Sequence, residues 1–388
     1  MTIRVEEVRD RRALDGYEAE WRALVEATPS AELFSTPEWI TSWLDAYWEG
    51  RPIAFLFARD GGRLAGVAPL LRDESGMLRC RGSLALPTDA GSWRGEITQA
   101  GDPAGEALAA LFGYLRADGR FRLTLGRMAT DSVTARALQD ATGRSGLWAV
   151  WREEHGTPLV SLRGTFEEYL QSRSKHVRHE LKRKRKKLEA SGAMELRVVH
   201  RPEELDAALG DVMAVEARSW KGEAGTSFLE GPGDLRFFRS LIERTADREW
   251  VRIYLLYHEG RPIAHLFGVV YGKRYYAINC SFDTAFEKHS PGAVVVLRAI
   301  EDGFAQGLET FDFLGSEYRW KEELATAIRP HLAVCLFPSL LSKCGWCWAM
   351  DQQLKPWVRR RLPVLIRAKR AAIAWGRGRA RRDAARLQ

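Results

Sequence analysis

The sequence has few cysteines and no long apolar run. Its five cysteines are scattered over 388 residues, which is not the pattern of a disulfide framework. No apolar stretch reaches the roughly 20 residues that a membrane-spanning helix needs. The first residues, MTIRVEEVRDRR, are charged from the start and lack the apolar segment of a secretory signal. These absences favour a cytoplasmic protein.

A metal-ligand pattern is also missing. His176 and His179 lie three positions apart, but no third ligand accompanies them and their surroundings are cationic. Cys344 and Cys347 have the spacing of a redox pair without the strand–helix context of a thioredoxin-like site. The sequence therefore predicts no metal site, and we interpret the cysteine pair as incidental.

Positive charge is present, but it is concentrated in two segments. The chain has a formal net charge of +8, and residues 355–388 alone contain twelve Lys or Arg and one Asp. The rest of the chain is therefore slightly acidic on balance. A second basic run, residues 173–187, contains nine Lys or Arg and one Glu. The basic character is local and does not describe the body of the protein.

The basic C-terminal tail also contains apolar side chains at Val364, Leu365, Ile366, Ala368, Ile373 and Trp375. Such a segment suits the inner face of an anionic membrane or a partner protein. It equally suits a solubilising extension, and the sequence leaves these interpretations open. The remaining chain is long enough for two domains.

The two halves of the chain repeat one order of predicted helices and strands. In the first half, Thr36 and Pro37 have the residue types of a helix cap and a first helical turn. A strand hairpin follows, turning at Gly61 and Gly62. A similar hairpin turns at Gly260 in the second half. The repeated order indicates an internal duplication.

One segment of the second half, residues 286–321, combines a helix start with a strand end. Ser290, Pro291 and Gly292 predict the start of a helix of about four turns that ends near Gly307. A short strand, residues 310–314, is predicted next, with its aromatic residues on one face and Asp312 on the other. The segment places a helix N-terminus, which suits an anion, next to polar groups at a strand end.

At this point the chain resembles a known family. The segments SRSKHVRHELKRKRKKLEASG, EARSW, EGRPIAHLFGVVYGKRYYAINCSFD and KHSPGAVVVLRAIEDGFAQGLETFDFLGSEYRWKEELA are similar to GNAT-like acetyltransferases of the CelD or BioF2-like group. The resemblance covers roughly residues 165–334. Wider relatives include the FemABX transferases, which carry two GNAT-like units in one chain, and the first half fits the first of those units.

The resemblance implies an α/β (α+β) fold with tandem GNAT-like units, each a twisted mixed sheet flanked by helices. The expected units are residues 1–160 and residues 161–340, followed by a basic tail at 341–388. The resemblance also implies acetyl-CoA as the acyl donor, bound at the start of this helix. The glycine-rich turn that usually binds CoA in the family has only one glycine here. The donor-binding residues expected on this basis are Lys288, His289, Ser290, Pro291, Gly292 and Ala293.

The expected catalytic residues come from three places: Asp312 from the predicted strand, Glu317, Tyr318 and Lys321 from the loop that follows it, and Glu216 from a helix. Asp312 is a candidate for proton transfer or for orienting the acceptor. Tyr318 has a hydroxyl suited to protonating a leaving thiolate, and Lys321 has a charge suited to an acidic acceptor. Glu216 and Glu317 are candidate general bases. Each of these residue types also occurs commonly as plain surface or core structure.

The predicted substrate-binding residues are Trp220, Tyr276 and Asp283. His265 lies in an apolar strand, and we interpret it as a core histidine. The basic run at 173–187 has three interpretations: a solvated helix, a surface that attracts an anionic substrate such as CoA, or a contact for tRNA.

The sequence therefore predicts an acyltransferase that moves an acetyl or similar group from acyl-CoA to an amine or hydroxyl acceptor. The acceptor is expected to be a small molecule or a saccharide made for cellulose or exopolysaccharide. One alternative is a FemABX-like transfer of an aminoacyl group from tRNA, which is the only role foreseen for nucleic acid. The other is a non-catalytic accessory protein at a membrane.

Overall fold

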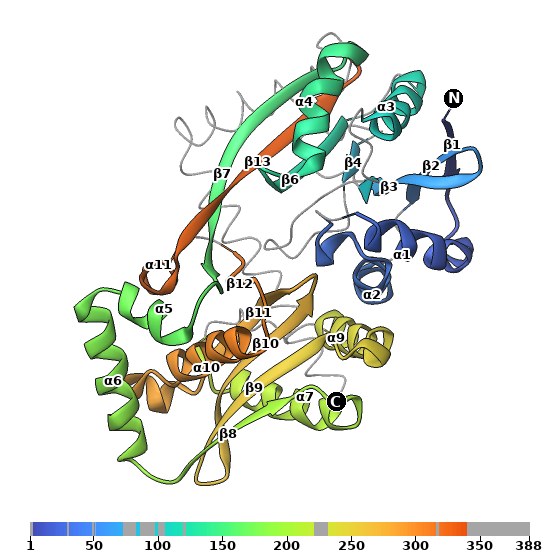
Figure 1. The fold of residues 1–388 in the computed structure, drawn as a ribbon. Helices are drawn as coiled ribbons and strands as arrows, with labels where there is room; N and C mark the ends of the chain where they lie inside the picture. The colour runs from blue at the N-terminus through green and yellow to red at the C-terminus, as the bar shows by residue number, and fades with distance from the viewer. Residues whose placement is uncertain are drawn as a thin grey trace, which may run out of the picture.

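The computed structural model describes residues 3–28, 31–48, 50, 52–72, 83–85, 98–99, 105–118, 122–220, 232–315 and 318–339. Within these residues, thirteen strands form one continuous mixed sheet with helices on its faces. Figure 1 shows the sheet running the length of the molecule, with the N-terminal strands at one end and β8 at the other. The predicted basic tail and the pair Cys344 and Cys347 lie outside the described residues.

The N-terminal half contributes one end of this sheet. Strands β1, β2 and β3 are antiparallel neighbours, β4 joins β3 and runs parallel to β6, and β5 pairs with β3 off the main path. The strands are β1 Arg4–Val8, β2 Ile53–Asp60, β3 Arg63–Arg72, β4 Ser83–Ala85, β5 Thr98–Gln99 and β6 Arg122–Ala129. The helices are η1 Arg12–Tyr17, α1 Glu18–Glu26, η2 Leu33–Ser35, α2 Pro37–Tyr47, α3 Glu106–Asp118 and α4 Val133–Ser145.

The C-terminal half contributes the other end. Strands β8 to β11 are antiparallel neighbours in chain order, and β12 runs parallel to β11. The strands are β8 Met194–Val199, β9 Val251–His258, β10 Arg261–Tyr271, β11 Arg274–Phe282 and β12 Thr310–Asp312. The helices are α5 Phe166–Ser172, α6 Lys175–Glu189, α7 Pro202–Glu216, α9 Pro232–Arg244, η3 Ala246–Arg248, η4 Thr284–His289, α10 Pro291–Ala305 and α11 Arg319–Leu324.

Two long strands join the halves. Strand β7, Trp148–Ser161, pairs with β13, Ala327–Phe337, along most of its length and with β12 at its end. Strand β13 also pairs with β6, so a strand late in the sequence lies between two strands of the first half. The division expected at residue 160 falls near the end of β7 and stays a prediction.

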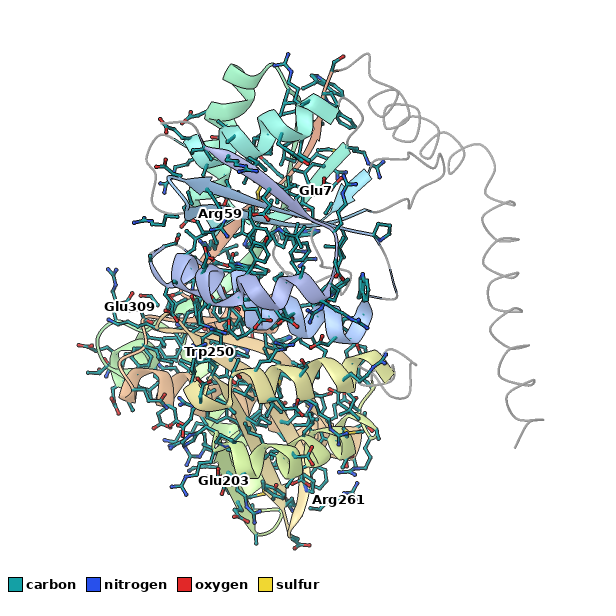
Figure 2. The ribbon with its side chains drawn as sticks, turned by 90° about the vertical axis from the view of Figure 1, so that its right-hand side faces the viewer. Glu7, Arg59, Glu203, Trp250, Arg261 and Glu309 are labelled. Atoms are coloured by element: carbon teal, nitrogen blue, oxygen red, sulfur yellow. The ribbon has the colours of Figure 1, made fainter. Side chains whose placement is uncertain are left out.

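The halves also share a hydrophobic core. One cluster of buried side chains includes Trp21, Trp39 and Trp43 from the first half, together with Phe237 and Tyr276 from the second. The rings of Trp39 and Phe237 are 4.9 Å apart, where α2 packs on α9. Figure 2 shows the blue helices α1 and α2 lying directly above the yellow α9. Apolar burial therefore holds the two halves together.

Several local predictions are confirmed. Thr36 caps α2 by accepting the N–H of Trp39 at 3.2 Å, and Pro37 begins the helix. Helix α10 ends with the Gly307 N–H bonded to Phe304 and the Leu308 N–H bonded to Gly303. This paired arrangement uses the left-handed conformation of Gly307, whose φ is +66°. The predicted hairpin β2–β3 forms at Gly61 and Gly62.

Two details differ from the sequence expectations. Ser290 adopts a left-handed conformation and its side chain makes no capping hydrogen bond to α10, so the expected cap is absent. The region of Lys321, expected to be a loop, forms the short helix α11. Ser290 ends the η4 turn, in which its N–H bonds to Glu287, and Lys321 of α11 donates to the carbonyl oxygen of Leu314 at the strand end.

Candidate functional site

Strands β11 and β12 pair over a short distance and then part. The pairing covers Arg274–Tyr276 on β11 and Thr310–Asp312 on β12. Strand β11 continues to Phe282, whereas the chain after β12 turns through Leu314 and Gly315, both with positive φ. Opposite β10, the register of β11 shifts between Ala277 and Asn279, so Ile278 is bulged. Beyond Tyr276, the edge of β11 is therefore no longer paired with β12.

The first turn of α10 lies against the end of β11. A Cβ atom on Gly292 would lie 3.3 Å from the ring of Phe282 and 3.8 Å from Sγ of Cys280. The helix N-terminus carries a partial positive charge and no side chain caps it. Lys288 is exposed and His289 half-buried in the segment before it. The predicted donor-binding residues thus lie together, beside the strand edge at which the pairing ends.

A buried polar cluster lies on the opposite face of the sheet. Oε1 of Glu216, at the end of α7, is 2.9 Å from Nδ2 of Asn279, which donates to it. The same oxygen is 3.1 Å from Nε2 of His265 on β10. Glu216 is 1% exposed and His265 is 0% exposed. The hydrogen bonds compensate for the burial of the carboxylate.

The register of the sheet places this cluster next to the opening of the strands. Tyr276 is paired with Asp312 at the last pairing position, and Asn279 follows three residues later on β11. His265 pairs with Ser281, so both strands contribute polar side chains to the α7 face. The hydroxyl of Ser281 is buried and makes no hydrogen bond within the described part of the chain.

Asp283 anchors the segment between β11 and α10. Its Oδ2 accepts from Arg218 at 2.8 Å and from Arg261 at 2.5 Å, and its Oδ1 accepts the Ala285 N–H at 3.0 Å. Burial alone would raise the pKa of this carboxyl. The hydrogen bonds from Arg218, Ala285 and Arg261 outweigh burial and hold the pKa of Asp283 below its ordinary value.

Asp312 organises the turn after β12. It is 0% exposed, accepts the N–H of Leu314 at 3.0 Å and lies 3.5 Å from Arg274. Arg274 also contacts the buried carboxylate of Glu32, from the first half, at 3.1 Å. Arg329 of β13 forms an ion pair with the same carboxylate. The position of Asp312 is therefore linked to the first half of the chain.

Lys321 lies on α11 and reaches back to the same turn. Its Nζ donates to the carbonyl oxygen of Leu314 at 2.8 Å and to that of Phe313 at 3.3 Å. The ammonium is 5.3 Å from the ring of Tyr318 and 5.7 Å from that of Trp320. Tyr318 is exposed. Asp312 and Lys321 thus meet at one turn, and Tyr318 lies beside it.

The remaining predicted residues are more dispersed. Trp220 is exposed and lies four residues beyond the end of α7 at Glu216. Tyr276 is buried in the shared core, where its ring packs on Phe34. Glu317 lies outside the described residues. The substrate-binding roles of Trp220, Tyr276 and Asp283 stay predictions.

Sequence reasoning did not assign a site role to Asn279 or Arg274, and it interpreted His265 as a core residue. His265 is indeed buried, but it contacts a candidate catalytic carboxylate. A signal was present in the sequence, because Asn279 and Ser281 are polar residues at alternate positions of an otherwise apolar strand. Polar groups on a buried face need partners, and Asn279 and His265 have a common one in Glu216.

The described residues contain no group of three or more His, Cys, Asp or Glu arranged to hold a metal ion. Over the same residues, no helix is both long enough and apolar enough to cross a membrane.

Comparisons with known proteins agree with this geometry. The family described as Acetyltransf_6, acetyltransferase (GNAT) domain, matches residues 175–322. No match was found among curated proteins. The crystal structure of FemX is similar, with a TM-score of 0.56 and 12% sequence identity, covering 86% of this chain and 97% of FemX. L-PGS from Bacillus licheniformis gives a TM-score of 0.55 and 12% identity, covering 88% of this chain and 97% of L-PGS.

Residues 175–322 match an acetyltransferase (GNAT) domain, and the fold of the chain is similar to those of FemX and L-PGS. The expected fold class, mixed α/β with twisted mixed sheets, is confirmed. The family implies an acyl-CoA donor and a small-molecule acceptor.

Proposed function

We propose that the protein transfers an acetyl or similar acyl group from acyl-CoA to an amine or hydroxyl of its acceptor. The observation that carries this proposal is the short pairing of β11 with β12, which ends beside the N-terminus of α10. A strand edge without a neighbour offers backbone groups to an extended ligand, and a helix N-terminus suits the pyrophosphate of CoA.

The donor occupies the α10 face in this proposal. Gly292 supports this assignment, because its missing side chain lets the first turn of α10 approach Phe282. Lys288 and His289 add positive charge before the helix. The backbone of β11 next to the bulge at Ile278 is suited to hold the thioester between the donor and the opposite face.

The acceptor approaches from the α7 face. Its nitrogen or oxygen attacks the thioester carbonyl carbon, the new C–N or C–O bond forms, and the C–S bond breaks. Glu216 takes the proton of the acceptor, directly or through one water. His265 and Asn279 hold the carboxylate in position. Trp220, exposed four residues beyond the end of α7, provides a ring surface for the acceptor.

The turn after β12 completes the proposed site. Asp312 accepts the N–H of Leu314, and Lys321 donates to the carbonyl oxygen of the same residue. These two hydrogen bonds position the turn opposite β11. Tyr318 donates a proton to the thiolate of CoA as it leaves. A saccharide acceptor for cellulose or exopolysaccharide synthesis is a finer proposal, supported by the family resemblance and by the exposed ring of Trp220.

A titration with acetyl-CoA tests the donor site, using Gly292→Glu and Gly292→Gln as a matched pair. Both side chains crowd Phe282 equally, so the difference between them isolates the added negative charge. We expect the Glu variant to bind at least tenfold more weakly than the Gln variant, because the charge repels the pyrophosphate. Equal affinity of the two variants would show that the donor lies elsewhere.

A charged tRNA is the donor that most needs to be distinguished from acyl-CoA. Binding of aminoacyl-tRNA that weakens steeply with salt, together with no binding of acetyl-CoA, would favour aminoacyl transfer instead.

A further inference from the structure

We infer that lysines on the C-terminal half of α6 bind the 3′-phosphate of CoA. This inference rests on the proposed donor site at α10. The sequence left three interpretations of the basic run at 173–187 open, and the position of α6 in the fold distinguishes between them. The ligand group is a phosphate monoester, carried on the ribose beyond the pyrophosphate.

Helix α6 packs alongside the helix whose start is the proposed donor site. Val177 and Leu188 belong to the same buried cluster as Val295 and Val296 of α10. Figure 1 shows α6 standing beside α10. The helix is therefore close enough to contribute side chains to a ligand that starts at α10.

The C-terminal end of α6 lies next to η4, the turn that leads into α10. Ser191, just after α6, hydrogen-bonds His258 at 3.3 Å, and the ring of His258 lies 5.0 Å from that of Phe286 in η4. Lys288 follows two residues later in η4 and is exposed. The last turns of α6 and the segment before α10 thus form one continuous surface.

The charges on α6 are of two kinds. Its arginines Arg183 and Arg185 pair with Glu180 and Glu189, at 2.7 Å and 2.8 Å. By contrast, within the described part of the chain no ion pair is formed by Lys182, Lys184, Lys186, Lys187 or Lys288. Unpaired lysines gathered at one place attract an anion more strongly than lysines neutralised by glutamates.

Two of these lysines lie on or beside the apolar stripe by which α6 packs on the core. Lys184 is half-buried and follows Val177 by seven residues, which places it on the buried stripe that also carries Leu188. A lysine there lays its stem on the core and presents its ammonium at the surface. Lys187 is three residues further along and adjoins the same stripe.

Glu287 is the acidic residue in this part of η4, and it is exposed. On α6, Glu180 interacts electrostatically with Lys184, but it also pairs with Arg183, so Lys184 and Lys187 still add positive charge here. Lysine ammonium groups are compact point charges that suit a phosphate monoester without requiring a planar, bidentate geometry.

Calorimetric titration with CoA and with 3′-dephospho-CoA tests the inference. The two ligands differ only in the phosphate monoester. We expect the natural protein to bind CoA about tenfold more tightly, and the double variant Lys184→Gln/Lys187→Gln to lose this preference while keeping its affinity for 3′-dephospho-CoA.

The variant Lys182→Gln/Lys186→Gln is the matched control. It removes the same charge from the opposite side of α6, about half a turn from the buried stripe. We expect it to keep the preference for CoA. The inference is overturned if the natural protein binds both ligands equally, or if the control loses the preference to the same extent. If neither ligand binds, the donor assignment itself fails, and the inference fails with it.

Discussion

Replacing Asp283 gives a sharp test of how the structure holds the segment that leads into the proposed donor site. The carboxylate accepts from Arg218 and Arg261 and also caps η4 through the Ala285 N–H. Asp283→Asn keeps an oxygen for the cap but turns an amide toward the two arginines. Asp283→Ala removes all three hydrogen bonds. The pair of variants therefore separates the charge from the cap.

The expected loss of stability depends on how far the hydrogen-bond partners of Asp283 are exposed to solvent. A hydrogen bond to a charged group contributes about 1.5–3 kcal/mol when it is well protected. The side chain of Asp283 is 3% exposed, but those of Arg218 and Arg261 are 32% and 54% exposed, so solvent screens part of the attraction. We expect Asp283→Asn to lower the free energy of unfolding by about 2 kcal/mol and Asp283→Ala by about 3 kcal/mol.

The pH dependence gives an independent check. Folding lowers the pKa of Asp283, so its contribution to stability is fully present above the ordinary value of about 4. This contribution is lost as the pH falls through the lowered pKa of the folded state. Urea unfolding, followed by tryptophan fluorescence, should show a difference between the natural protein and Asp283→Asn that is constant near pH 7 and shrinks below pH 4.

Two results would refute this reasoning. One is an Asp283→Asn variant as stable as the natural protein at pH 7. The other is a stability difference that persists unchanged in acid, since a protonated carboxyl no longer pairs with Arg218. We also expect Asp283→Ala to weaken acetyl-CoA binding, because the segment that it anchors leads into α10.

The other predictions concern the acceptor face and the bulged region of the sheet. Glu216→Gln is expected to lower the rate of CoA release with a panel of amine acceptors by about 10²-fold while acetyl-CoA affinity is kept; an undiminished rate would exclude Glu216 as the base. Gly268→Ala is expected to destabilise the protein by about 3 kcal/mol in thermal unfolding, since the added Cβ would lie 2.1 Å from the buried ring of Tyr275. The control is Gly113→Ala on α3, because a Cβ added there would have no neighbour within 4 Å. We expect this variant to leave the stability unchanged or to raise it slightly.

Local signals in the sequence were sufficient for the segment that carries the proposed donor site. The start and end of α10 and the alternation of Phe311, Asp312 and Phe313 were predicted as the structure has them. These features depend on backbone conformations and side-chain periods that neighbouring residues determine by themselves. The cap expected from Ser290 did not form, because the preceding turn at η4 holds its backbone in a left-handed conformation.

The pairing of distant elements could not be predicted in this way. Glu216, His265 and Asn279 come from a helix and two strands, and their contact depends on the packing of α7 on the sheet. Arg274 meets Glu32 across 242 positions of sequence. No local pattern encodes such a contact, because each residue alone is compatible with a solvent-exposed position.

The sequence by itself determined the kinds and order of most elements, α11 excepted, and the start of α10, since these follow from short-range hydrogen bonding and periodicity. Only the tertiary structure decided that β13 lies between β6 and β7, that β11 and β12 part after three paired residues, and that α6 stands beside α10. These arrangements depend on burying apolar faces contributed from both halves of the chain, and such burial is a property of the whole fold.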